Sequence, residues 1–433
     1  ILAGLINLSY NLWVLSFGDF VGWNNPYGNI LGTFGNPNFI GAFLGMLFSV
    51  CLAFALDSQQ KPWKRIGVFC CMPITAFEIL ASDAVQGRVV ASFGSGIVLF
   101  FYLKSKFSRI VLVAFTLLSG LIGSFAVAGA FQKGPLTALI YKNSVSLRGQ
   151  YWLAAWNTGK KNILTGSGMD SFGDMYRSMR DAHALELPGI NTVVNTAHNV
   201  PLDMFAFGGL PLFSIYLLII FFSGRSAFRI LSASKKFDFV SVALVSAWSG
   251  YQLQSIISIN QIGLAIWGWL LSGLLISYEL SIRDTKESKE SGAQEKAIRR
   301  KSINKLPEHI RIIAFFSSFL GFLIALPPLS SDISWKNARD ASSLPLIEKS
   351  MDGSYFNPQN AQKYVENIDL LERSELYDLS RTYALQAVKW NPESFDLWKL
   401  LYLVRNSTEK EKLLAISNMK RLDPLNPDVT SIK

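Results

Sequence analysis

The chain has 433 residues, of which 50% are hydrophobic and only 17% are charged. Soluble globular proteins carry about a quarter charged residues, and the apolar residues here gather in runs of about the 20 residues that cross a bilayer. The composition therefore excludes an ordinary soluble protein and predicts an integral membrane protein. The formal net charge of +10 would indicate nucleic acid in a soluble protein, so the position of the basic residues must be considered.

Length and hydropathy predict about nine membrane-spanning helices. They lie at residues 1–17, 38–56, 66–81, 88–103, 109–130, 199–222, 239–256, 262–280 and 310–328. The first begins at Ile1 without a methionine or a basic leader, which indicates a fragment that lacks upstream helices. The cysteines Cys51, Cys70 and Cys71 fall inside apolar runs and have no disulfide or metal-site spacing, so we expect packed thiols.

Basic residues gather in alternate connections between these segments, after the second, fourth, sixth and eighth. They are Lys61, Lys64, Arg65, Lys104, Lys106, Arg109, Arg225, Arg229, Lys235, Lys236 and a run from Arg283 to Lys305. This is the positive-inside pattern, which predicts that these loops are cytoplasmic. It explains the net charge without a nucleic-acid partner. By parity, residues 18–37, the long loop 131–198 and everything after about 329 face outward.

The C-terminal part begins with a charged stretch, residues 282–308, that predicts a cytoplasmic linker between a transmembrane domain (1–281) and a last transmembrane helix (309–328). Residues 329–433 then carry Asn-Pro pairs at Asn357, Asn391 and Asn426, at intervals of 34 and 35 residues. A helix-turn-helix period of about 34 residues is typical of tetratricopeptide-type repeats. We expect an extracytoplasmic α-helical repeat domain that binds a protein partner, with a packing or spacer domain as the alternative.

Ionisable side chains gather in the connections predicted to face outward. They are Arg88, Arg148, Arg177, Arg180 and His198. An ionisable group at the mouth of a helix bundle costs free energy unless it forms an ion pair or has a function. Arginine is the natural bidentate partner of phosphate oxygens. Together they suit a lipid that carries a diphosphate. The structural alternatives are a helix anchor for Arg88, a surface position for Arg148 and a helix cap for His198.

The stretch GTFGNPNFIGAFLG, residues 32–45, begins the second apolar segment. Asn36 before Pro37 predicts an N-cap followed by proline in the first helical turn. The free N–H groups and positive dipole end of such a helix start also suit a lipid diphosphate. Asn36 and Asn38 are therefore candidate substrate-binding residues.

Four motifs follow one another along the chain: GTFGNPNFIGAFLG, GRVVASFGSG, RGQYWLAAWNTGKKNILTGSGMDSFGDMY and AHNVPLDMFAFGGLP. Their order, spacing and common side resemble the superfamily of O-antigen ligases, O-antigen polymerases and protein O-oligosaccharyltransferases, over about residues 29–222. The resemblance implies a GT-C-like helix bundle in the bacterial inner membrane. Such an enzyme moves a preassembled glycan from undecaprenyl diphosphate to a glycan, lipid or protein acceptor outside the cytoplasm.

The resemblance also assigns residues. The family's essential loop histidine falls on His198, paired with Asn199, and its phosphate-binding arginines fall on Arg88 and Arg148. Arg177 and Arg180 are further candidates for substrate binding. Gly166, Gly168, Phe172 and Tyr176 match a Gly-x-Gly…Phe…Tyr pattern with an expected structural role. Gln86 and Gly87 depart from the serine-rich approach to Arg88 that many members have.

The expected reaction is attack of an acceptor hydroxyl on the anomeric carbon, with departure of the lipid diphosphate. Arg88 and Arg148 stabilise the leaving charge, and His198 orients or deprotonates the hydroxyl. We expect no metal and no cofactor, because arginines supply the positive charge and Asp170 and Asp174 are too isolated for a metal site.

Ligase and polymerase stay open as alternatives, because both use this chemistry, and the repeat tail favours ligase only slightly. A bicarbonate-like transporter is the hypothesis from another class. Paired acidic residues inside the helices would favour this hypothesis, but Glu78 is nearly the only acidic residue at an intramembrane position. The polar residues gather instead in one outward loop, which favours an enzyme.

Overall fold

The computed structural model describes residues 1–22, 25–233, 236–290 and 308–432, and the chain divides into two units. Unit 1 comprises residues 1–172 and 194–287, and unit 2 comprises 173–193 and 288–433. Among the described residues the regular structure is helical, apart from an isolated bridge between Ser354 and Asn357. The predicted all-α fold of a polytopic membrane protein is confirmed.

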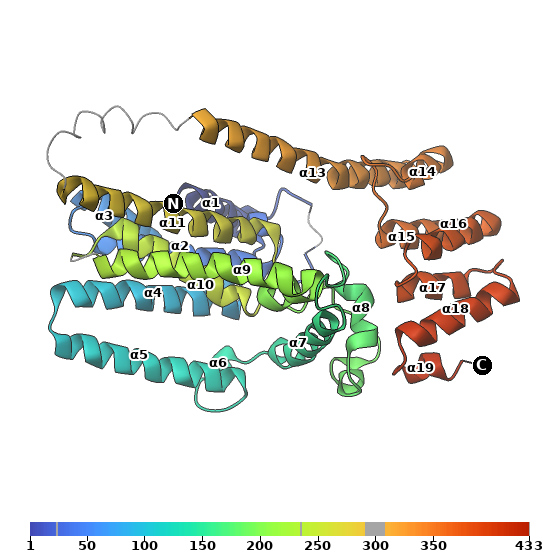
Figure 1. Ribbon diagram of the computed structural model, residues 1–433, viewed down its shortest axis with the longest axis horizontal. Helices are drawn as coiled ribbons and strands as arrows, with labels where there is room; N and C mark the ends of the chain where they lie inside the picture. Colours follow the sequence, from blue (N-terminus) through green and yellow to red (C-terminus); the bar gives the residue numbers. More distant parts are fainter. Residues whose placement is uncertain (23–24, 234–235, 291–307, 433) are drawn as a thin grey trace. The chain divides into compact units, whose positions relative to one another are not determined.

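Unit 1 holds η1 and the α-helices from α1 to α11 in Figure 1, except for most of α8 and the last residues of α11. They are α1 (Leu2–Phe17), η1 (Gly32–Phe34), α2 (Pro37–Leu56), α3 (Pro62–Ala81), α4 (Val85–Lys106), α5 (Arg109–Ala130), α6 (Thr137–Ile140), α7 (Asn143–Lys161), α9 (Val200–Ala233), α10 (Phe239–Ser255) and α11 (Ile262–Glu290). Each apolar segment predicted between residues 1 and 281 coincides with one of these helices.

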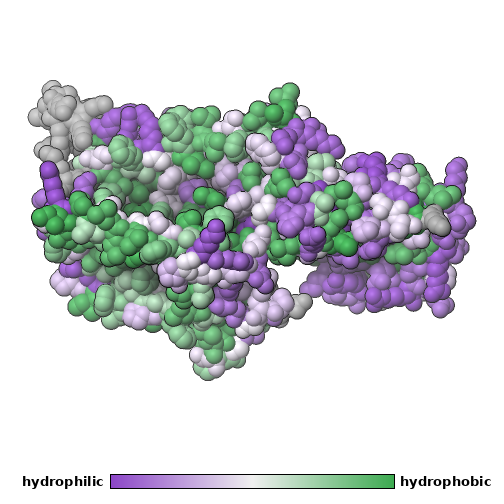
Figure 2. Space-filling view, turned by 90° about the horizontal axis from the view of Figure 1, so that it is seen from below, coloured by the Kyte–Doolittle hydropathy of each residue, from purple (hydrophilic) through white to green (hydrophobic). Residues whose placement is uncertain are grey.

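Within the described ranges, six helices are long and apolar enough to cross a membrane: α2, α4, α5, α9, α11 and α13. Of the other predicted spans, α1 has 16 residues, α3 contains three charged side chains, and α10 has 17 residues, so their crossing stays a prediction. Hydrophobic residues cover much of the bundle surface in Figure 2. None of the most apolar window of α5 is buried, as expected of a helix that faces lipid.

Helix α2 is the central helix of unit 1 and packs against α3, α4 and α10. It meets α4 through glycines: a Cβ on Gly87 would lie 2.8 Å from the Gly41 backbone, and one on Gly45 would lie 2.7 Å from the Gly87 carbonyl oxygen. Small residues allow such close approach between membrane helices. The N-terminal ends of α2 and α4 are thereby held side by side.

Helix α9 is longer than the predicted 199–222 and is broken at Gly208 and Gly209, whose backbone is not helical. The loop after α7 fills the break. The Ser167 N–H donates to the Ala206 carbonyl at 2.9 Å and the Gly168 N–H to Phe207 at 3.0 Å, while the Leu210 N–H donates back to Ile163 at 2.8 Å. Buried backbone groups must be paired, so the Gly-x-Gly motif fastens α7 to α9.

Unit 2 consists of most of α8 and the C-terminal helices. Its elements are α8 (Phe172–Met179, from Gly173 onward), η2 (Leu185–Gly189), α13 (Glu308–Asp340), α14 (Leu344–Met351), α15 (Ala361–Arg373), α16 (Tyr377–Trp390), α17 (Phe395–Leu403), α18 (Glu409–Leu422) and α19 (Pro427–Thr430). Successive helices from α15 to α19 pack against one another (Figure 1), around a core that includes Ile368, Leu397 and Leu401.

The Asn-Pro pairs lie in turns of this unit: before α15, between α16 and α17, and at the start of α19. Stacked helices with turns at this period agree with a repeat domain, and its assignment as tetratricopeptide-like stays a prediction. We call residues 329–433 the tail domain.

Three predicted boundaries differ from the structure. Helix α13 runs through the boundary at 328 and ends at Asp340, because its apolar part continues into an amphipathic one without a break. Helix α11 runs to Glu290, and the remainder of the predicted linker 282–308, residues 291–307, lies outside the described residues. Residues 173–193 of the loop 131–198 belong to unit 2.

Candidate active site

A cavity of about 310 Å³ lies in unit 1 where the ends of several helices meet. Its walls come from the N-terminal ends of α2 and α4, from α7, from the loop before α9 and from the connection between α10 and α11. They consist of Asn36, Asn38, Phe39, Gln86, Ser144, Leu147, Arg148, Tyr151, Val194, His198, Ser258 and Ile259. All these elements end on the side predicted to be extracytoplasmic. Four of the predicted site residues, Asn36, Asn38, Arg148 and His198, therefore meet in one cavity.

Arg148 is a half-buried cation on α7 without a counter-ion. Its Nε atom is buried and has no hydrogen-bond partner, and none of the described residues forms an ion pair with it. Burial lowers the pKa of its guanidinium, although Tyr151 one turn further along α7 acts in the opposite direction. A desolvated, unpaired charge is costly. An anion in the cavity would compensate it with charge-assisted hydrogen bonds.

His198 lies in the loop before α9 with its ring 5.7 Å from that of Tyr151. Its Nδ1 atom is 3.3 Å from the Thr196 carbonyl oxygen and 3.4 Å from the Thr196 hydroxyl oxygen. A proton on Nδ1 would satisfy the carbonyl and leave the lone pair on Nε2. Burial lowers the pKa of His198 below the ordinary 6.5, the Thr196 carbonyl opposes this, and Arg148 lowers it further. Burial therefore favours the neutral form of the His198 ring.

The backbone around His198 is strained and firmly held. His198 has a φ of 55°, in the left-handed region that few residues other than glycine adopt. On one side of it, the Ala197 N–H donates to the Asp203 carboxylate at 2.7 Å. On the other, the Asn199 side chain accepts from the Leu202 N–H and donates to the Ile256 carbonyl, both at 3.0 Å.

Asn199 was predicted to bind substrate, but its amide is engaged in capping α9 and holding the α10–α11 connection, and it does not line the cavity. Its contacts are those of a positioning residue for the His198 loop. Asp203, which was not among the predicted site residues, has the same role. An acid in the first turn of an apolar helix was the available signal, because carboxylates there can bind free backbone N–H groups.

The predicted N-cap at Asn36 is confirmed. Its Oδ1 accepts from the Asn38 N–H at 2.9 Å, and Pro37 occupies the first turn of α2. The Phe39 and Ile40 N–H groups donate to the Asn36 carbonyl. The first-turn N–H groups expected to bind a diphosphate are therefore already engaged. Asn36 and Asn38 can therefore contact a ligand only through their side chains.

Gln86 is a cavity residue that sequence analysis treated only as a departure from the family pattern. Its Nε2 donates to the Ile257 carbonyl at 3.3 Å, so its Oε1, which is buried and has no partner, is free to accept a hydrogen bond. The cavity thus combines a donor without a partner, on Arg148, with acceptors on Gln86 and His198. Donors suit an anion and acceptors suit hydroxyl groups.

Arg88, by contrast, does not line the cavity. Two residues along a helix correspond to roughly 200° of rotation, so the Arg88 side chain leaves α4 on a different face from Gln86. It is half-buried, and within the described ranges it has no hydrogen-bond or ion-pair partner. A role in phosphate binding requires the bound lipid to extend beyond the cavity.

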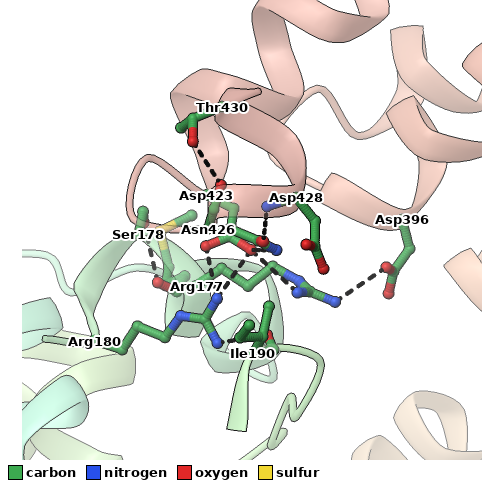
Figure 3. A network of polar contacts seen from close by, with 10 residues as sticks. Arg177, Ser178, Arg180, Ile190, Asp396, Asp423, Asn426, Asp428 and Thr430 are labelled. Carbon is green, nitrogen blue, oxygen red and sulfur yellow. Dashed lines mark hydrogen bonds and ion pairs between the residues drawn. The ribbon is translucent and has the colours of Figure 1, made fainter. Parts of the chain in front are cut away.

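Arg177 and Arg180, also predicted to bind substrate, lie in unit 2, where both bind the buried carboxylate of Asp423 (Figure 3). Their guanidinium groups already have an anionic partner, so a role as substrate ligands gains no support. Among the residues that the structure describes, no group of three or more His, Cys, Asp or Glu side chains is placed to hold a metal ion.

Residues 74–217, about a third of the chain, match the model of a family described as O-antigen ligase. The match includes α4, α7, the His198 loop and the first part of α9, which provide most of the cavity wall. It supports the resemblance to the O-antigen ligase superfamily that the sequence motifs indicated, and it does not extend to the tail domain. No curated protein and no solved structure matches the chain.

Proposed function

We propose that this protein transfers a glycan from undecaprenyl diphosphate to an acceptor hydroxyl outside the cytoplasm, as an O-antigen ligase does. The observation that carries the proposal is the pairing, in one cavity, of an arginine without a counter-ion and a half-buried histidine. The family match over the helices that form the cavity supports glycan transfer by a membrane enzyme.

In the proposed step, the acceptor oxygen attacks the anomeric carbon of the donor sugar while the bond from that carbon to the diphosphate oxygen breaks. The diphosphate leaves with the electron pair, and Arg148 binds its growing negative charge. The hydroxyl proton passes to His198 Nε2, and the imidazolium later releases it to water. Gln86 Oε1 is placed to accept a hydrogen bond from a sugar hydroxyl.

Arg88 has a secondary role in this proposal. A diphosphate with its prenyl chain and glycan is larger than a cavity of about 310 Å³, so part of the donor must lie outside. The half-buried, unpaired Arg88 at the same end of α4 offers a second cation for the phosphate that the cavity does not enclose.

The test is a transfer assay in membranes or detergent with a lipid-diphosphate-linked glycan and an acceptor glycolipid. We expect His198→Gln to lower transfer by about 10²- to 10⁴-fold, the usual contribution of a general base. His309→Gln, which changes an exposed histidine at the start of α13, is the matched control and should retain full activity. Unchanged transfer by His198→Gln would overturn the mechanism.

The products of the same assay separate ligase from polymerase. Attachment of the whole glycan to the acceptor supports a ligase. Growth of the lipid-linked glycan by repeat units without an acceptor supports a polymerase that uses the same site.

A further inference from the structure

Asp423 is the centre of a buried ion-pair network in unit 2. Its side chain and that of Arg180 are both 0% exposed. Arg180 Nη2 donates to both Asp423 oxygens, at 2.8 and 3.0 Å, and Arg177 Nη1 donates to one of them at 3.2 Å. Asn426 Nδ2 adds a further hydrogen bond at 3.0 Å. A carboxylate so buried is stable only with such partners.

The two sides of this network come from distant parts of the sequence, as Figure 3 shows. Asp423 and Asn426 belong to the tail domain. The arginines belong to residues 173–193, which we call the docked segment, and Arg180 is 243 residues from Asp423. Arg180 also donates to the carbonyl of Ile190 at 2.8 Å, so one side chain fixes both the fold of the docked segment and its attachment.

The recurring Asn-Pro turns provide the surface on which the segment lies. The amide oxygens of Asn391 and Asn426 close their own turns by accepting the N–H two residues on. Their amide nitrogens remain to donate: Asn391 to Asp174 at 2.8 Å, and Asn426 to Asp423. In two successive Asn-Pro turns, the asparagine Nδ2 atom thus donates a hydrogen bond at this surface. Between them, the Arg177 guanidinium lies 4.3 Å from the Phe395 ring centre.

We propose that the tail domain binds the docked segment of its own chain through Asp423, and that this attachment keeps the His198 loop in place. The segment continues directly into unit 1 at both ends, at Phe172 and at Val194. Val194 lines the cavity and His198 follows four residues later. A fixed segment limits the conformations open to the short connection that carries His198, whereas a released one would let it fluctuate.

The docked segment also limits which partner the tail domain can bind. The surface formed by its Asn-Pro turns is occupied by an internal segment that supplies two cations and one acid. An external protein that used this surface would have to displace that segment. The attachment itself is independent of the proposed function, and only its effect on glycan transfer rests on that function.

The experiment is hydrogen–deuterium exchange on the full chain in detergent, with glycan transfer measured in parallel. Asp423→Asn removes the buried charge without changing the shape of the side chain. Because loss of one partner of a buried pair leaves the other charge uncompensated, exchange in residues 173–193 should rise by about 10²- to 10³-fold. Exchange in residues 194–199 should rise with it, and transfer should fall.

Asp428→Asn is the matched control, because it makes the same chemical change in the same turn on an exposed side chain, and it should behave as the unaltered protein. Arg180→Met keeps the tail domain's own residues intact. A loss of protection confined to 173–199 in this variant distinguishes release of the segment from unfolding of the tail domain, which would also unprotect α15 and α16.

Three outcomes decide the proposal. Unchanged exchange in 173–193 for both Asp423→Asn and Arg180→Met would refute the attachment. Increased exchange there without a change in 194–199 would refute the coupling to the His198 loop. Absence of transfer by the unaltered protein would count against the proposed function alone, since exchange still decides the attachment.

Discussion

Gly166 is the position at which one added methyl group should separate the two helices that hold the site. A Cβ there would lie 2.2 Å from the Phe207 carbonyl carbon, 2.3 Å from its oxygen and 2.4 Å from the Gly208 nitrogen. Non-bonded carbon atoms need about 3.5 Å, and all three neighbours are backbone atoms that cannot rotate away. Gly166→Ala must therefore push the loop out of the break in α9.

The cost has two parts. Gly166 has a φ of 65°, and an alanine in this left-handed conformation costs about 1–2 kcal/mol. Moving the loop also weakens the hydrogen bonds from the Ser167 and Gly168 N–H groups to α9, each of which contributes about 0.5–1.5 kcal/mol. The sum is about 2–5 kcal/mol. For a domain of this size, that corresponds to a lower melting temperature by roughly 5–15 °C.

The assay is thermal unfolding of the detergent-purified protein followed by tryptophan fluorescence, with transfer activity on the same samples. Gly149→Ala on α7 is one control, because its Cβ would meet nothing within 4 Å. Gly168→Ala is the second control. Gly168 has a φ of 100°, but the atom nearest to an added Cβ, Ser171 Oγ, would be 3.9 Å away. This variant therefore measures the cost of backbone strain without a steric clash. If Gly166→Ala melts no lower than Gly149→Ala, the loop does not fasten α7 to α9.

Three further predictions concern charge. In the proposed mechanism His198 must be neutral to accept a proton, and its pKa is below the ordinary 6.5. The value of kcat/KM should therefore be constant near pH 7 and fall only below pH 6.5. A midpoint at or above pH 6.5 in the pH–rate profile would contradict this. Arg148→Lys keeps the positive charge but loses the planar guanidinium that can donate two parallel hydrogen bonds, so kcat/KM should fall by about 10- to 100-fold. An unchanged kcat/KM would mean that Arg148 binds no phosphate. Hydrogen bonds from Arg381 and then Thr408 hold the pKa of Glu411 at about 2 instead of 4.5, so the tail domain should lose stability as the pH falls from 4.5 to 2. Melting curves of Glu411→Gln should show a smaller loss of stability over this pH range than those of the unaltered protein.

The sequence predicted α1 to α5 and α9 to α11 because each of these helices alone exceeds or approaches the length and apolarity that a membrane demands. It also predicted the N-cap at Asn36, since Asn before Pro at the start of an apolar run is a local signal. It did not predict the break in α9. The signal was present, because Gly208 and Gly209 are followed by Pro211, which has no N–H for the Phe207 carbonyl. Only the structure shows that the loop after α7 supplies the substitute partner.

Within the candidate site, the local signals were strong for His198 and weak for the residues around it. Gln86 and Ser258 face the cavity because of how α4 and the α10–α11 connection pack, and neither residue carries a charge or motif that indicates this. The sequence also did not predict that α13 continues beyond its apolar run. Its apolar run ends near residue 328, but the helix continues to Asp340 because Trp335 and Ala338 pack into the tail-domain core.

The arginines show why charge in an outward loop does not by itself identify a substrate site. Arg148 and Arg180 have the same chemistry and the same predicted side of the membrane, and 32 residues separate them in the chain. Arg180 meets a buried carboxylate from 243 residues away, which compensates its charge. Arg148 meets no acid among the described residues, so its charge has no such partner. The arginine that we propose to bind phosphate thus differs from the one that joins two parts of the fold by lacking a counter-ion within a cavity, and only the tertiary structure contains that information.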